Sequence, residues 1–192
     1  MEAIVLAGGF GTRLQSVVND VPKPMAPVNG KPFLEYILTY LHQQSITRVV
    51  LSVGYKWDYI QRHFGDRFLN MDLVYCVEED PLGTGGAIKK ALTYTTGDQI
   101  YIVNGDTFFN VDLGQLTLLP DGVCCLALKP MNEFDRYGCV EMDHRGVVTS
   151  FKKKGYYEKG FINGGIYLIS RSIFDAFSLK NTFSFETFLE EN

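Results

Sequence analysis

The sequence predicts an α/β fold: a mixed, mostly parallel sheet with helices on both faces and antiparallel strands added in the C-terminal half. Short apolar runs alternate with helical patterns over residues 1–105, which is the order that builds parallel sheets with crossover helices. From residue 123 onward, closely spaced strand patterns replace that alternation. A chain of 192 residues with 46% hydrophobic residues can bury one core without metal or disulfide staples.

The expected elements follow from periodicity. Runs rich in β-branched and aromatic residues predict buried parallel strands at 3–7, 48–53, 72–77 and 99–103. Apolar residues spaced three and four apart predict helices at 33–41, 57–64 and 88–92. Antiparallel strands are expected at 123–129, 138–142, 147–151 and 161–169, and helical segments at 172–177 and 185–191. Ligands of such a sheet bind beyond the carboxyl ends of its parallel strands.

Composition excludes several classes of function. The net charge of -4 argues against a nucleic-acid-binding or anionic membrane surface, so neither nucleic acid nor membrane is expected as a partner. The N-terminal apolar run is too short for a signal peptide, no run is long enough to span a membrane, and we expect a cytoplasmic protein. Four cysteines without a CxxC pair and three scattered histidines indicate buried thiols rather than a zinc site.

A glycine-rich stretch, LAGGFGTRL, follows the first predicted strand. The third glycine of a dinucleotide fingerprint is replaced by Leu14, and Arg13 is not followed by the Lys-Ser/Thr pair of a Walker A loop. What remains is a turn whose backbone N–H groups can face phosphate oxygens, with the Thr12 hydroxyl as a donor and the Arg13 guanidinium as a charged, bidentate donor. We expect a polyphosphate here; the alternative is a tight turn that caps the next helix.

Three further segments carry chemistry of the same kind. Lys23 stands between two prolines in PKPMAP, which predicts an extended loop that presents an ammonium, or else a merely exposed lysine. The cluster GTGGA at 83–87 lets backbone approach a flat ring or a phosphate, or else only starts a helix. Asp106 directly follows a predicted strand and suits Mg²⁺, which takes one or two carboxylates plus phosphate oxygens; the alternative is a turn aspartate.

Together, LAGGFGTRL, PKPM, GTGGA, NGD and INGGIY, in this order, resemble the sugar-1-phosphate nucleotidylyltransferases. Longer runs, among them PLGTGGAIKKAL, NGDTFFNVDL and FSFETFLEEN, are most similar to the heptose 1-phosphate guanylyltransferases of that family, over essentially the whole chain. The resemblance implies a Rossmann-like, three-layer nucleotide-diphospho-sugar transferase fold in one domain, with a nucleotide-binding half at 1–122 and a sugar-binding half at 123–192. It also implies Mg²⁺ as cofactor.

The resemblance also implies roles for individual residues. Arg13, Lys23 and Asp106 would be catalytic, with Arg13 on the departing pyrophosphate, Lys23 where the two phosphates meet and Asp106 on the metal. The residues implied for the nucleotide are Leu6, Gly8, Gly9, Gly11, Thr12, Arg13, Gly83, Thr84 and Gly85. Those implied for the sugar phosphate are Gly138, Lys153, Lys154, Asn163, Gly164 and Glu186.

Two departures from the family pattern stand out. Members carry a Glu-Lys pair after a strand, whereas this chain reads Phe-Lys-Lys-Lys at 151–154, which makes Lys154 the first choice for the sugar phosphate and Lys153 the second. Members also continue into a final strand that supplies a second metal-binding aspartate. No such run is present before Asn192, so we expect a missing C-terminal tail or another group, with Asp112 the nearest acid in sequence.

The resemblance implies transfer of GMP from GTP to D-glycero-α-D-manno-heptose 1-phosphate, with release of pyrophosphate and formation of a nucleotide-sugar. Mannose 1-phosphate guanylyl transfer and glucose 1-phosphate thymidylyl, uridylyl or cytidylyl transfer remain alternatives, because GTGGA-like loops serve all these members. A non-catalytic nucleotide-sugar-binding regulatory subunit is an alternative of another class, supported by the absent second aspartate. A dehydrogenase is disfavoured at Leu14. Whether the chain forms a homo-oligomer is left open.

Overall fold

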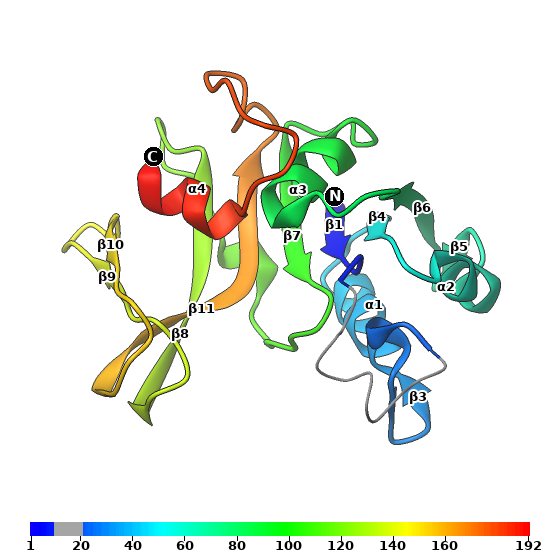
Figure 1. Ribbon diagram of the computed structural model, residues 1–192, viewed down its shortest axis with the longest axis horizontal. Coiled ribbons are helices and arrows are strands. Elements are labelled where there is room, and N and C mark those ends of the chain that lie inside the picture. Colours follow the sequence, from blue (N-terminus) through cyan, green and yellow to red (C-terminus); the bar gives the residue numbers. More distant parts are fainter. Residues whose placement is uncertain (10–20) are drawn as a thin grey trace.

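The central sheet is built on four parallel strands. The computed structural model describes residues 1–9 and 21–192. In this part of the chain a nine-stranded sheet has the order β10-β9-β11-β7-β1-β4-β6-β5, and β8 pairs with β11 outside that path (Figure 1). The parallel strands are β1 (Glu2–Leu6), β4 (Arg48–Val53), β6 (Met71–Val77) and β7 (Gln99–Asn104). The four predicted parallel strands are therefore confirmed.

Helices cover both faces of this sheet, which makes three layers (Figure 1). Side chains alternate along a strand, so Ala3 and Val5 of β1 pack in one core cluster while Ile4 packs in the other. The first cluster holds the apolar faces of α1 (Phe33–Gln43) and α2 (Trp57–Phe64), and the second those of α3 (Gly83–Leu92) and α4 (Phe185–Glu191). The near-continuous apolar character of the parallel strands follows from this double burial.

Antiparallel strands extend the sheet on the β7 side. The long strand β11 (Tyr157–Ser170) pairs with β7 and with β8 (Cys124–Phe134), and it also contacts β9 (Val140–Met142), which pairs with β10 (Val148–Phe151). The pairing of β11 with β8 shifts register between Asn163 and Tyr167. Beyond this shift, the ribbon of β8 and β11 projects away from the parallel strands (Figure 1). The predicted antiparallel additions are confirmed, and β8 and β11 are longer than expected.

Two local predictions are wrong. Lys23 lies in a 3-10 turn, η1 (Lys23–Met25), rather than in an extended loop, because Pro22 and Ala26 close the turn and Met25 is buried. The segment 172–177 forms successive turns with hydrogen bonds such as Asp175 N–H to the Ser172 carbonyl, and it is not a helix. Ile173 and Phe174 are nevertheless buried there, so the apolar pattern reflects packing.

The remaining short elements complete the chain. They are β2 (Pro27–Val28), β3 (Lys31–Pro32), β5 (Arg67–Phe68) and the 3-10 helix η2 (Leu113–Gln115). Within residues 1–9 and 21–192, none of the helices combines the length and the apolar character that a bilayer span requires. All four cysteines are free thiols; Cys76 and Cys139 are buried, and Cys124 and Cys125 are partly buried.

Candidate active site

A cavity of about 370 Å³ lies where the parallel strands end. Leu6 ends β1 and Asn104 ends β7, and both line the cavity together with the loops that follow them. The structure thus has a cavity at the carboxyl edge, where α/β sheets generally bind ligands. The sequence-predicted residues that line it are Leu6, Gly8, Gly9, Lys23, Gly83, Thr84 and Asp106.

Lys23 and Asp106 form an ion pair inside this lining. Asp106 comes two residues after the end of β7, and Lys23 opens η1, so the two side chains approach from segments far apart in the chain. Lys23 Nζ donates to Asp106 Oδ2 at 2.5 Å, and the side chains are 31% and 46% exposed, respectively. Thr107 Oγ1 donates to the other oxygen, Asp106 Oδ1, at 3.2 Å. A cation of the protein itself therefore lies where the sequence predicts a metal ion.

Glu78 is a site residue that sequence reasoning missed. It directly follows β6 and lines the cavity. Ser52 Oγ donates to Glu78 Oε1 at 2.8 Å, and the Leu82 backbone N–H donates to Glu78 Oε2 at 3.2 Å. A Cβ at Gly8 would lie 2.6 Å from Glu78 Oε1, so the glycine makes room for this carboxylate. An acid right after a buried parallel strand is the same signal that pointed to Asp106.

The GTGG cluster forms the first turn of α3, so the helix begins earlier than predicted, at Gly83. Gly83 has a φ of +69°, and a Cβ there would lie 2.5 Å from the Phe183 carbonyl oxygen. Cβ atoms at Gly85 and Gly86 would collide with the Phe183 ring and the Asn181 carbonyl. The glycines are thus required by the 181–183 segment behind them, while Gly83 and Thr84 face the cavity.

Glu186 contacts the GTGG cluster. Its Oε2 atom accepts hydrogen bonds from Thr84 Oγ1 at 2.8 Å and from Ser184 Oγ at 3.0 Å. Ser184 also caps α4, because its Oγ accepts from the Thr187 N–H at 3.2 Å. The family resemblance assigns Glu186 to the sugar and Thr84 to the nucleotide, and the structure shows these two residues hydrogen-bonded to each other.

Asn163 and Gly164 lie at the bend of β11. Asn163 Oδ1 accepts from the Gly165 N–H at 2.8 Å, and its Nδ2 donates to the Tyr167 hydroxyl at 2.7 Å. Burial raises the pKa of Tyr167 well above its ordinary value, so the hydroxyl stays neutral. A Cβ at Gly165 would lie 2.7 Å from Nδ2 of Asn104, which lines the cavity. The Asn163 turn therefore adjoins the cavity without lining it.

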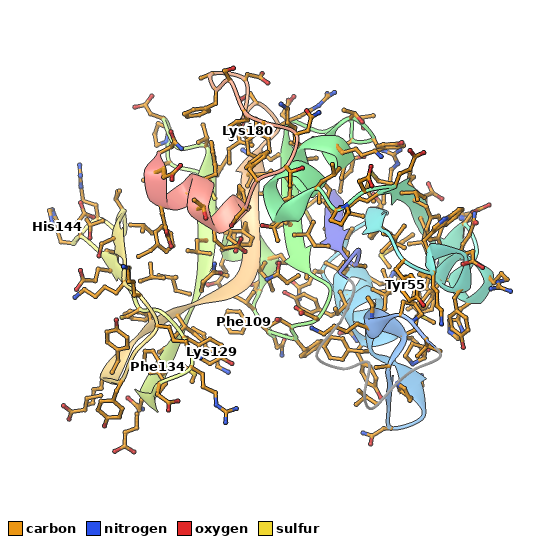
Figure 2. The ribbon with its side chains drawn as sticks, viewed as in Figure 1. Tyr55, Phe109, Lys129, Phe134, His144 and Lys180 are labelled. Atoms are coloured by element: carbon orange, nitrogen blue, oxygen red, sulfur yellow. The ribbon has the colours of Figure 1, made fainter. Side chains whose placement is uncertain are left out.

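The other predicted sugar-side residues lie farther along the β8–β11 ribbon. A Cβ at Gly138 would collide with the Lys152 carbonyl, so Gly138 packs against the segment that carries Lys153 and Lys154. Both lysines are exposed, and none of these three residues lines the 370 Å³ cavity. Figure 2 shows Phe109 between this ribbon and the α1 side of the molecule, with Lys129 and Phe134 on the ribbon itself. Gly164 packs against the Phe109 ring.

The remaining predicted nucleotide residues are Gly11, Thr12 and Arg13, and they lie outside the described residues. For the metal, no group of three or more His, Cys, Asp or Glu side chains gathers anywhere in residues 1–9 and 21–192. Asp106 nevertheless fits a magnesium ion that brings phosphate oxygens with it, because its half-exposed carboxylate lies at the cavity and already holds a cation.

Comparison with known proteins gives a consistent result. A family model described as nucleotidyl transferase matches residues 2–191. The D-glycero-α-D-manno-heptose 1-phosphate guanylyltransferases of Campylobacter jejuni and Aneurinibacillus thermoaerophilus are 52% and 51% identical; each match covers 100% of this chain, and 86% and 84% of the relatives. HddC from Yersinia pseudotuberculosis, solved in complex with GMP-PN, is 37% identical with a TM-score of 0.83, over 96% of this chain and 83% of that one.

The fold expectation is confirmed beyond close relatives. The inositol-1-phosphate CTP transferase from T. maritima is 21% identical and superposes with a TM-score of 0.79 over 99% of this chain and 80% of that one. Such a likeness concerns the fold alone, and it is the Rossmann-like arrangement inferred from the motifs. The cavity at the carboxyl edge, the glycine-rich loops around it and the match over residues 2–191 agree: the chain belongs to the nucleotidyl transferase family.

Proposed function

We propose that this chain transfers GMP from GTP to D-glycero-α-D-manno-heptose 1-phosphate, forming a GDP-sugar and releasing pyrophosphate. The observation that carries the proposal is the cavity at the carboxyl edge of β1 and β7, lined by Gly8, Gly9, Lys23 and Asp106, in a chain 52% identical to a heptose 1-phosphate guanylyltransferase. Backbone N–H groups, an ammonium and a carboxylate suit a triphosphate with its cation. We place the nucleotide in the half formed by 1–122 and the sugar phosphate in 123–192.

Guanine is the proposed base because of Glu78. Guanine presents two adjacent donors on its pairing edge, the N1–H and the 2-amino group, and a carboxylate offers two acceptors side by side. Glu78 is held at the cavity by Ser52 and by the Leu82 N–H, which leaves lone pairs on both oxygens for a base. Thymine, uracil and cytosine do not present two adjacent donors. The geometry therefore favours GTP among the nucleotides that family members use.

The proposed reaction is an in-line displacement. An oxygen of the sugar 1-phosphate attacks the α-phosphorus of GTP, a phosphorus–oxygen bond forms, and pyrophosphate leaves with the electron pair of the bond that breaks. Attacker and target are both anionic, so the protein's part is positioning and charge compensation. Lys23 and Arg13 stabilise the phosphates, Lys154 or Lys153 holds the sugar phosphate, and Asp106 holds Mg²⁺. When bound, the metal neutralises phosphate charge and aligns the triphosphate.

The test is a matrix of nucleoside triphosphates against sugar 1-phosphates, scored by formation of the nucleotide-sugar. GTP with the heptose 1-phosphate is expected to dominate, with mannose 1-phosphate as the main competitor. Faster turnover with another pair would reassign the substrates while leaving the reaction class intact. Tight binding of GTP and GDP-sugar by calorimetry without turnover for any pair would instead support the regulatory subunit.

A further inference from the structure

Two side chains that the proposed reaction directs at different ligands are bound to each other. The proposal places the Lys23 ammonium on the phosphates and the Asp106 carboxylate on a divalent cation. In the structure, Lys23 Nζ lies 2.5 Å from Asp106 Oδ2, and both residues line the same cavity. Thr107 Oγ1 occupies the other carboxylate oxygen at 3.2 Å. Each oxygen of the carboxylate therefore already accepts one hydrogen bond, and one of the two donors is a cation.

We propose that Lys23 acts as a built-in counter-ion that weakens the binding of free divalent cations to Asp106, so that the site favours a metal that comes together with the triphosphate. The inference rests on the proposed function and adds an order of binding to it. With the metal–nucleotide complex bound, the Lys23 ammonium would pair with the phosphates, and the Asp106 carboxylate would be free to hold the metal. The Lys23–Asp106 ion pair would thus be replaced by two others, Lys23 with the phosphates and Asp106 with the metal.

The charges at the site explain why the exchange requires the nucleotide. An ammonium and a divalent cation repel each other and compete for the same carboxylate oxygen. No group of three or more His, Cys, Asp or Glu side chains forms a separate cation cage in residues 1–9 and 21–192. A free Mg²⁺ also gives up its waters reluctantly and binds through one or two carboxylates plus phosphates. A metal bound to a triphosphate brings those oxygens and also offers Lys23 a new partner.

The local structure lets the side chain move while the backbone stays in place. Pro22 and Pro24 restrict the φ angles on either side of Lys23, and Met25 is buried in the core. The Met25 N–H donates to the Pro22 carbonyl at 2.8 Å, which closes the turn. The Lys23 side chain itself is 31% exposed and lines the cavity, so its ammonium can turn toward a ligand there while the backbone of the turn stays in place. The switch is thus confined to one flexible side chain.

The experiment measures Mn²⁺ binding to the nucleotide-free chain by electron paramagnetic resonance. Lys23→Gln is expected to raise Mn²⁺ affinity about three- to fivefold, the scale of a partly exposed ion pair. The matched control is Lys31→Gln, which breaks an ion pair with Glu35 on the surface and leaves Mn²⁺ affinity unchanged. Adding Asp106→Asn to Lys23→Gln abolishes the gain. Thermal melts verify that each variant is folded.

Equal Mn²⁺ affinity of the wild type and Lys23→Gln overturns the inference, as does a gain that survives Asp106→Asn. A second measurement supports it from the other side: with GTP present, Lys23→Gln weakens binding of the Mn²⁺–GTP complex, because the phosphates have lost their ammonium. The metal titration without nucleotide is independent of turnover. A wild type that forms no nucleotide-sugar, combined with a Lys23→Gln gain, contradicts the proposed function and leaves the ion-pair competition standing.

Discussion

Thr84 Oγ1 donates a hydrogen bond of 2.8 Å to Glu186 Oε2, and the same hydroxyl accepts from the Phe185 N–H at 2.8 Å. These contacts join the first turn of α3 to the first turn of α4. Thr84 lines the cavity, whereas Glu186 does not. The C-terminal helix therefore fixes the position of the loop that we propose for the nucleobase.

Replacing the Thr84 hydroxyl tests this relationship. Thr84→Val leaves the Phe185 N–H without its partner and the Glu186 carboxylate with the Ser184 hydroxyl alone, and a hydrogen bond to a charged group contributes about 1.5–3 kcal/mol. If the loop moves accordingly, calorimetry will show GTP affinity reduced about tenfold. Thr84→Ser keeps the hydroxyl and is expected to bind like the wild type. Wild-type affinity of Thr84→Val contradicts the positioning role.

Base selection by Glu78 can be measured with inosine triphosphate, which lacks the 2-amino group of guanine. The wild type is expected to prefer GTP over ITP about tenfold in kcat/KM, since one hydrogen bond to a carboxylate is lost. Glu78→Gln offers one acceptor instead of two and reduces that preference. Glu79→Gln is the matched control, because Glu79 is exposed next to it and does not line the cavity. An unchanged GTP/ITP ratio in Glu78→Gln removes Glu78 from base recognition.

If Lys23 and Arg13 compensate the phosphate charge, removing either cation strongly lowers turnover. Lys23→Ala or Arg13→Ala is expected to lower kcat by at least ~10²-fold, the scale for one charge-stabilising donor. Steady-state release of pyrophosphate measures this effect. Lys31→Ala serves as the control, because Lys31 pairs with Glu35 outside the cavity. Near-wild-type rates in the first two variants would exclude these side chains from the mechanism.

Glu2 makes stability depend on pH. The side chain is buried, which raises its pKa, but hydrogen bonds from the Gly97 N–H, Arg48 and the Thr96 N–H outweigh burial and lower the pKa below its usual 4.5. Its contribution is therefore full above pH 4.5 and is lost as pH falls through the lower, folded-state value.

Denaturant titrations of wild type and Glu2→Gln between pH 7 and pH 3 measure this contribution. Glu2→Gln is expected to lower the free energy of unfolding by about 1–3 kcal/mol at pH 7. The difference in the free energy of unfolding between wild type and Glu2→Gln becomes smaller at low pH, because the wild-type carboxylate is protonated there. A difference in the free energy of unfolding that stays constant with pH contradicts the role of the charged Glu2.

Packing at the β11 bend predicts that alanine destabilises the protein at Gly164 but not at Gly155. A Cβ at Gly164 would collide with the Phe109 ring and lie 2.9 Å from the Ala127 carbonyl oxygen, whereas at Gly155 the nearest atom is 3.9 Å away. Gly164→Ala is expected to lower the free energy of unfolding by about 1–3 kcal/mol, as overpacked sites do. Gly155→Ala is expected to leave it nearly unchanged. Urea denaturation of the two variants compares them directly, and equal stabilities contradict this prediction.

Much of the fold could be predicted from local sequence because its strands are buried on both faces. Runs such as 48–53 are apolar throughout, and the observed strand Arg48–Val53 has the same bounds. Local signals failed where tertiary packing decides conformation. The 172–177 segment has the apolar spacing of a helix but forms a series of turns. Its residues Ile173 and Phe174 belong to the same buried cluster as the apolar side chains of α4.

The site was harder to predict than the fold because its contacts join distant segments. Lys23 and Asp106 are 83 residues apart, and Thr84 and Glu186 are 102 residues apart, so no spacing rule links them. The motifs identified which residues carry charge or lack side chains, but not which of them touch. Glu78 was overlooked because it belongs to no motif and becomes notable only once Gly8 and Ser52 are seen around it.

The continuity of β11 limits how the molecule can respond to its ligands. One strand of 14 residues pairs with β7 beside the proposed nucleotide site and with β8 in the half that we propose for the sugar phosphate. Hinged closure of one half over the other would strain this shared backbone least between Asn163 and Ile166, where the pairing with β8 is interrupted and the pairing with β7 has not yet begun. Any opening motion is thus concentrated at Gly164 and Gly165, where the Gly165 N–H is held by the Asn163 side chain and not by a neighbouring strand.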